Sequence, residues 1–96
     1  MKKLRVRFKK RWVEALRSGK YEQGKFTLIS PNRKFCCLGV AFDLLHPGEY
    51  TVLKALTYQQ RKKIGLGRAE QLCLTMKNDY GKQSFDDIAN WIEKNL

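Results

Sequence analysis

The stretch CCLGVAFDLL, residues 36–45, is almost wholly apolar and decides the fold class. Asp43 is its one charged residue, so a helix over 37–45 would be apolar on nearly every side. Such a helix is buried at the centre of a protein rather than laid on its surface. Gly39 lies within it, where the missing side chain lets another segment approach closely. We therefore predict a buried central helix that ends at His46-Pro47-Gly48.

The segment before this run predicts a small β-hairpin. Phe26–Ile29 has the composition of a short strand, and Ser30–Arg33 places proline at the second position of a type I turn. Residues 34–36 can then return as the partner strand. Because an isolated two-stranded hairpin is only marginally stable in water, we expect it to pack on the helix of residues 37–45.

A first helix is predicted from about Arg5 to Arg17. Residues 4–9 also alternate as a strand would, but the helical interpretation accounts for more positions. Ser18-Gly19 supplies the stop signal. The helical stripe contains five apolar residues: Leu4, Phe8, Trp12, Ala15 and Leu16.

Three further helices are predicted downstream, two of them opened by capping boxes. Thr57 with Gln60 opens a short helix that ends at Gly65, and Ser84 with Asp87 opens the last helix. Between them a helix over residues 68–77 carries Ala69, Leu72, Cys73 and Met76 on one face and is followed by a turn at 78–81. The last helix has an apolar stripe of Phe85, Ile88, Ala89, Ile92 and Leu96.

The chain as a whole predicts a mainly α (α+β) fold. It would have about five helices and one small β-hairpin, in a single domain over residues 1–96. Residues 50–56 are too short to assign and are expected to be extended. Trp12 and Trp91 lie on or beside apolar stripes, so we expect both to pack in the core.

Positive charge is concentrated in one third of the chain. Residues 1–34 hold twelve Lys and Arg against two Glu, whereas residues 35–96 hold eight against seven Asp and Glu, within a total of +11. A concentrated positive field attracts polyanions and speeds their encounter. The alternative is a solvated face that only keeps the protein soluble.

Composition also restricts the class of protein. No apolar run approaches the ~20 residues needed to span a bilayer, and residues 1–11 lack the apolar centre of a signal peptide. Three cysteines, an odd number, suit a compartment that keeps thiols reduced. We therefore expect a cytoplasmic protein with no membrane partner.

The order of several short motifs resembles a group of small proteins encoded by tailed phages and prophages. The shared pattern is WVxALRSGxYxQ, CCLGV, ND and SFxxIAxxIE, found here at residues 12–23, 36–40, 78–79 and 84–93. This resemblance implies a phage accessory protein made in the bacterial host cytoplasm, and it carries no catalytic assignment. The basic opening, Lys2 to Arg11, precedes the pattern, so residues 1–11 would be a basic arm or an extension of the first helix.

The cysteines do not form the pattern of a metal or catalytic site. Cys36 and Cys37 are adjacent, and zinc sites usually pair ligands two to four residues apart. A nucleophilic cysteine would need a base such as His46 and an orienting carboxylate such as Asp43 or Asp79, but no accompanying loop signature is present. We expect core packing for these thiols, no catalysis, no metal and no cofactor.

The candidate binding residues lie near the N-terminus. Tyr21, an aromatic among cations, could stack on a base beside neutralised phosphates or simply cover the edge of the core. The full set is Arg5, Arg7, Lys9, Lys10, Arg11, Arg17, Lys20 and Tyr21. A second basic cluster, Arg61, Lys62, Lys63 and Arg68, surrounds the sequence GLG at 65–67, where we favour a plain turn between helices over an anion site at a helix N-terminus.

Two functional hypotheses follow. In the first, the basic N-terminal face binds an anionic ligand, either nucleic acid or a nucleotide. In the second, the protein inhibits a host or anti-phage defence protein, and its basic face meets an acidic patch on that partner.

Overall fold

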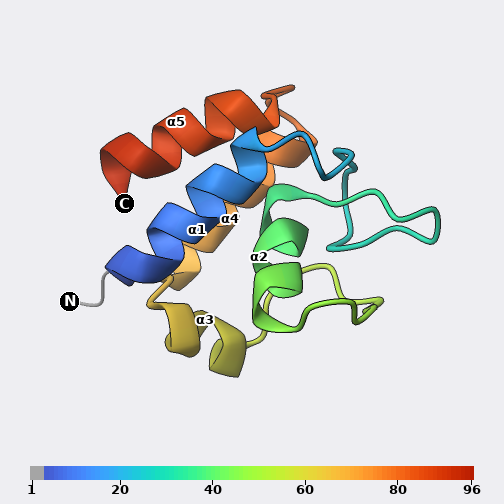
Figure 1. Ribbon diagram of the computed structural model, residues 1–96, viewed down its shortest axis with the longest axis horizontal. Helices are drawn as coiled ribbons and strands as arrows, with labels where there is room; N and C mark the ends of the chain where they lie inside the picture. Colours follow the sequence, from blue (N-terminus) through green and yellow to red (C-terminus); the bar gives the residue numbers. More distant parts are fainter. Residues whose placement is uncertain (1–3) are drawn as a thin grey trace.

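The computed structural model describes residues 4–96, and that part of the chain contains five helices. Their bounds are Val6–Arg17 (α1), Cys37–Leu45 (α2), Tyr58–Ile64 (α3), Arg68–Asp79 (α4) and Phe85–Asn95 (α5). Helix α1 packs against α2 and α5, and α4, which lies behind α1 in Figure 1, packs against the same two helices. The predicted mainly α architecture is confirmed.

Helix α1 buries the stripe that the sequence predicts. Phe8, Trp12 and Leu16 are buried, with Leu4 just ahead of the helix and Val13 beside the stripe. Trp12 is fully enclosed, and its indole Nε1–H donates to the carbonyl of Cys37, 2.9 Å away. This hydrogen bond satisfies the polar atom of the largest core side chain. It also joins α1 to the start of α2.

Helix α2 is the buried central helix expected from residues 37–45. Cys37 to Phe42 are all buried. At Gly39 the carbonyl of Leu28 lies so close that an added Cβ would collide with its oxygen. Only glycine permits this approach, which brings the loop between α1 and α2 onto α2.

That loop does not contain the predicted hairpin, although its turn is present. The amide of Arg33 donates to the carbonyl of Ser30 at 2.9 Å, which closes the turn. Phe26, however, has a left-handed φ of 72° and is half exposed, so residues 26–29 are not a continuous strand. The amide of Leu28 donates to the carbonyl of Leu53 rather than to a hairpin partner.

Where the second strand of the hairpin was predicted, Phe35 forms only isolated bridges. It forms a single parallel bridge with Gln23 and a single antiparallel bridge with Ile29. Its amide donates to the carbonyl of Glu22 at 2.8 Å, and its carbonyl accepts from the amide of Gly24 at 2.7 Å. The bridge to Ile29 is made by the flanking residues: the amide of Ser30 donates to the carbonyl of Lys34 at 2.8 Å, and the amide of Cys36 donates to the carbonyl of Leu28 at 3.2 Å. The pairing extends no further, because Phe26 has a left-handed φ and α2 begins at Cys37. The prediction of a two-stranded unit was therefore wrong.

Helices α3 and α5 begin at the capping boxes identified in the sequence. Thr57 and Gln60 bond reciprocally at α3, as do Ser84 and Asp87 at α5. Helix α3 stops at Gly65, whose φ of 80° is left-handed. Helix α4 runs to Asp79, two residues beyond the predicted end, so the predicted turn at 78–81 begins later.

Helix α4 turns its apolar face outward. Leu72 is 63% exposed and Met76 is 50% exposed, whereas Leu74 on the opposite side is fully buried. The buried side also carries Gln71 and Asn78. Helix α4 is therefore inverted relative to an ordinary amphipathic helix, in which the apolar stripe faces the core.

The amides of Gln71 and Asn78 explain this orientation. Gln71 Oε1 accepts from the amide of Leu56 at 2.9 Å. Asn78 Oδ1 accepts from Gln23 Nε2 at 2.9 Å and from the amide of Cys37 at 3.1 Å, while its Nδ2 donates to the carbonyl of Gly24 at 2.9 Å. Turning α4 to bury Leu72 would break these bonds and leave buried backbone groups unpaired.

No helix within residues 4–96 is long and apolar enough to cross a membrane. Of the basic opening, residues 6–11 are the first part of α1, and residues 1–3 lie outside the described residues.

Candidate anion-binding site

The start of α1 is fixed to the end of α3 by Arg5. Its backbone amide donates to the carbonyl of Ile64 at 2.8 Å, and its side-chain Nε donates to the carbonyl of Lys63 at 2.8 Å. These carbonyls belong to the last turn of α3, where helical carbonyls lack partners within the helix. Arg5 thus brings together the two basic segments of the chain, which are 58 residues apart in sequence.

A cleft of about 450 Å³ lies at this junction. We call it the α1–α3 cleft; it is lined by Arg5, His46, Gln59, Gln60, Lys62 and Lys63. No carboxylate is among these residues. Glu49, which does not line the cleft, approaches His46 Nδ1 at 3.9 Å. The lining therefore combines fixed positive charge with amide and imidazole groups that can donate or accept hydrogen bonds.

The exposed side of α1 carries further cations. Arg7, Lys10 and Arg11 are exposed. Within residues 4–96 the ion pairs are Arg17–Glu93, Lys34–Glu22 and His46–Glu49. None of these pairs neutralises the cations of the α1–α3 cleft or of the exposed side of α1. Their charge is therefore available to an anion.

Three of the predicted site residues line a hollow between α1 and α5. Lys9, Lys10 and Arg17 share it with Glu14 and Glu93. Arg17 bonds to Glu93 Oε1 at 3.0 Å and to Asn90 Oδ1 at 2.6 Å. Its hydrogen bond to Glu93 raises the pKa of Arg17 and lowers that of Glu93. Arg17 thus contributes to packing of α1 on α5.

Lys20 and Tyr21 follow α1 in the loop that leads to α2. Lys20 is exposed, whereas Tyr21 is partly buried, with its ring edge against Phe35 at 5.0 Å between centroids. The Tyr21 hydroxyl donates to Asp43 Oδ2 at 2.7 Å. Burial and this hydrogen bond raise the pKa of Tyr21 to about 12. Tyr21 therefore packs against the edge of the core.

The cysteines pack as the sequence predicts. Cys36 and Cys37 are buried, and Cys73 is partly exposed. Burial raises the pKa of Cys36 to about 11 and that of Cys37 well above its ordinary value, so both remain thiols near neutral pH. Within residues 4–96 no three His, Cys, Asp or Glu side chains gather as metal ligands would.

The sequence predicts a plain turn between helices at residues 65–67, within the second basic cluster, and this turn is confirmed. Gly65 ends α3 and Gly67 precedes α4. Sequence reasoning did not predict that Lys62 and Lys63 would join Arg5, because their meeting depends on backbone bonds between distant segments. It also missed Gln59, Gln60 and His46, which became cleft residues only through this tertiary contact.

Comparison with known proteins places the chain in a family. Neither a curated protein nor a solved structure matches it. The family described as "Domain of unknown function (DUF8296)" matches residues 4–51. That range is half of the chain and contains α1, the loop after it and α2. The chain therefore belongs to the DUF8296 family.

Proposed function

We propose that the protein binds phosphate groups of nucleic acid or a nucleotide, in the α1–α3 cleft and along the adjoining exposed side of α1. The observation that supports this most is the contact of Arg5 with α3, which unites two cationic segments at a cleft lined by no carboxylate. Cations held together in this way neutralise several phosphates at once and release their counterions.

The other cleft residues add hydrogen-bonding groups to this charge. Gln59, Gln60 and His46 lie beside Arg5, Lys62 and Lys63. Their side chains can pair with sugar hydroxyls or base edges while the cations hold the phosphates. The volume of about 450 Å³ lies within the usual range of sites for small ligands. The site would thus accept one nucleotide, free or within a strand.

The cellular setting is part of the same proposal. The motif order described above is similar to that of phage and prophage proteins, which supports a phage accessory protein acting in the cytoplasm of a bacterial host. Its role there would be non-catalytic.

The test is fluorescence anisotropy of the purified, nuclease-treated protein with short single- and double-stranded DNA and RNA and with labelled nucleotides, across a salt series. We expect binding to weaken steeply with salt, with a slope of about 0.9 per phosphate neutralised on duplex DNA. The variant Arg7→Glu/Lys10→Glu/Arg11→Glu should lose binding and keep its circular dichroism spectrum. Normal binding by this variant, or no binding by the wild type at low salt, would reject the proposal.

A second candidate function is inhibition of a host or anti-phage defence protein. One observation favours it, namely the exposed apolar side chains of α4, since such patches commonly mark protein interaction sites. It predicts a complex of defined stoichiometry recovered from nuclease-treated bacterial lysate. Recovery of nuclease-sensitive material alone would count against it.

A further inference from the structure

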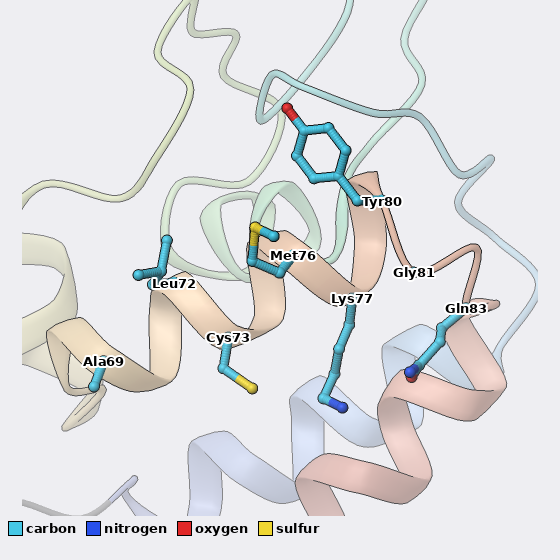
Figure 2. Close-up of a pocket in the computed structure, with 8 residues that line it drawn as sticks. All are labelled: Ala69, Leu72, Cys73, Met76, Lys77, Tyr80, Gly81 and Gln83. Carbon is cyan, nitrogen blue, oxygen red and sulfur yellow. The ribbon is translucent and has the colours of Figure 1, made fainter.

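Helix α4 presents a continuous apolar row to solvent. Figure 2 shows Leu72, Met76 and Tyr80 along one side of the helix, with Cys73 and Lys77 on the neighbouring side. Tyr80 is 64% exposed, and its ring packs edge-on against Phe26, which is 52% exposed, at 5.5 Å between centroids. The row thus extends from Leu72, in the first half of α4, past the end of the helix and onto the loop after α1. We call these residues the α4 row: Leu72, Met76, Tyr80 and Phe26.

The α4 row is held outward by the fold. Gln71 and Asn78, on the opposite side of α4, are committed to backbone groups of Leu56, Gly24 and Cys37. Rotation of the helix would break these bonds. The exposure of Leu72 and Met76 is therefore a fixed property of the folded chain.

Two hollows lie next to the α4 row, one on each side of Leu72. The first contains Met76, Lys77 and Tyr80, and the second contains Lys54, Arg68 and Thr75. Both are lined by Ala69 and Leu72, and each has a volume of about 650 Å³. Leu72 is thus a ridge between two depressions, an arrangement that accepts apolar side chains from a helix laid along α4.

The charge around the hollows specifies the partner. Lys54, Arg68 and Lys77 line them, and no Asp or Glu does so among the residues that the structure describes. An apolar surface with a cationic border is complementary to an apolar helix face bordered by carboxylates. A second copy of this chain does not meet that requirement, because each copy carries a net charge of +11 and the like-charged borders would repel.

We propose that the α4 row docks an acidic amphipathic helix of a partner protein. Apolar side chains of that helix occupy the hollows on both sides of Leu72, and its carboxylates face Lys54, Arg68 and Lys77. This inference deepens the second candidate function by assigning its surface and the chemistry of its partner. It is independent of anion binding at the α1–α3 cleft.

The probe is a fluorescein-labelled helical peptide of about 14 residues, which spans about 21 Å as a helix and so covers α4. It carries leucines at helical spacing and glutamates elsewhere. Two matched peptides replace either the leucines by serine or the glutamates by lysine. We expect the first peptide to bind the wild type in anisotropy titrations, and each matched peptide to bind at least tenfold more weakly.

Protein variants then assign the surface. Leu72→Gln/Met76→Gln removes the apolar contacts without a change of charge, and it should weaken peptide binding at least tenfold while the thermal midpoint stays unchanged. Lys54→Gln/Arg68→Gln should weaken binding and flatten its salt dependence. The α1 variant Arg7→Glu/Lys10→Glu/Arg11→Glu should retain most of the peptide affinity, which separates this surface from the anion site.

Three results would overturn the assignment. They are failure of the wild type to bind the acidic peptide, equal binding by Leu72→Gln/Met76→Gln, and a concentration-dependent dimer in sedimentation that this variant abolishes. The last result would mean that the α4 row binds a second copy of the chain instead of an acidic helix of another protein. Loss of nucleic-acid binding in the α1 variant with peptide binding retained would leave both proposals standing and distinguish them.

Discussion

At the scale of single residues, Asn78 connects more of the chain than any sequence motif indicates. Its side chain bonds Gln23 and Gly24 in the loop after α1 and the first amide of α2. Gln23, Cys37 and Asn78 are far apart in the sequence, yet in the fold they meet in one hydrogen-bond network. These three residues therefore hold the loop after α1, the start of α2 and the end of α4 together.

Replacement of Asn78 by alanine should lower the free energy of unfolding by about 3 kcal/mol, because the amide of Cys37 and the carbonyl of Gly24 would lose a buried partner. Urea denaturation followed by circular dichroism measures this change. Asn95→Ala, at an exposed asparagine that bonds the carbonyl of Trp91, is the control and should change stability by less than about 0.5 kcal/mol. Equal effects of the two substitutions would contradict the role of Asn78.

The buried thiols make stability depend on alkaline pH. In the unfolded chain Cys36 ionises near pH 9.0, whereas folding raises its pKa to about 11, and folding also raises the pKa of Cys37. The folded state therefore retains protons that the unfolded state releases, so stability is complete below about pH 9 and falls as pH rises from there.

We expect the urea midpoint to decrease as pH rises from about 9 to about 11. The decrease should be smaller in Cys36→Ala/Cys37→Ala and unchanged in Cys73→Ala, whose thiol lies at the surface. A flat profile for the wild type across this range would show that the thiols are not buried as described.

At the scale of elements, helix positions could be predicted and helix orientations only in part. Capping boxes and Gly65 are local signals, so α3 and α5 begin where the sequence indicates. The predicted hairpin is reduced to one bridge between Ile29 and Phe35, because Phe26 has a left-handed φ of 72° and the chain enters α2 at Cys37. The apolar spacing of α4 predicts which residues share a face, but the buried bonds of Gln71 decide which face is inside.

This inverted orientation predicts an unusual pair of leucine substitutions. Leu74→Ala should cost about 3 kcal/mol of unfolding free energy, because Leu74 is fully buried and its truncation leaves a cavity. Leu72→Ala, two residues earlier and mostly exposed, should cost less than about 0.5 kcal/mol. Urea denaturation of both variants gives the comparison. A larger loss from Leu72→Ala would mean that α4 faces the other way.

At the scale of the whole molecule, one third of the chain carries most of the net charge, but the fold decides where that charge is used. Sequence alone indicated a basic N-terminal segment and a separate basic cluster near Gly65. Their convergence rests on the bonds of Arg5 to Lys63 and Ile64, which no local pattern predicts. In the fold, Arg17 bonds to Glu93 and Tyr21 donates to Asp43. The candidate site therefore includes fewer residues near α1 than the sequence predicted, and it also includes residues of α3.

The most direct test of this convergence is the salt dependence of DNA binding in Lys62→Gln/Lys63→Gln, measured by anisotropy beside the wild type. Lys25→Gln/Lys82→Gln, which removes the same charge from exposed positions outside α1 and α3, is the matched control. If α1 and α3 form one anion site, the cleft variant should bind more weakly, with a salt slope smaller by about 1 to 2, while the control keeps the wild-type slope. Equal slopes for the cleft variant and the wild type would contradict the account.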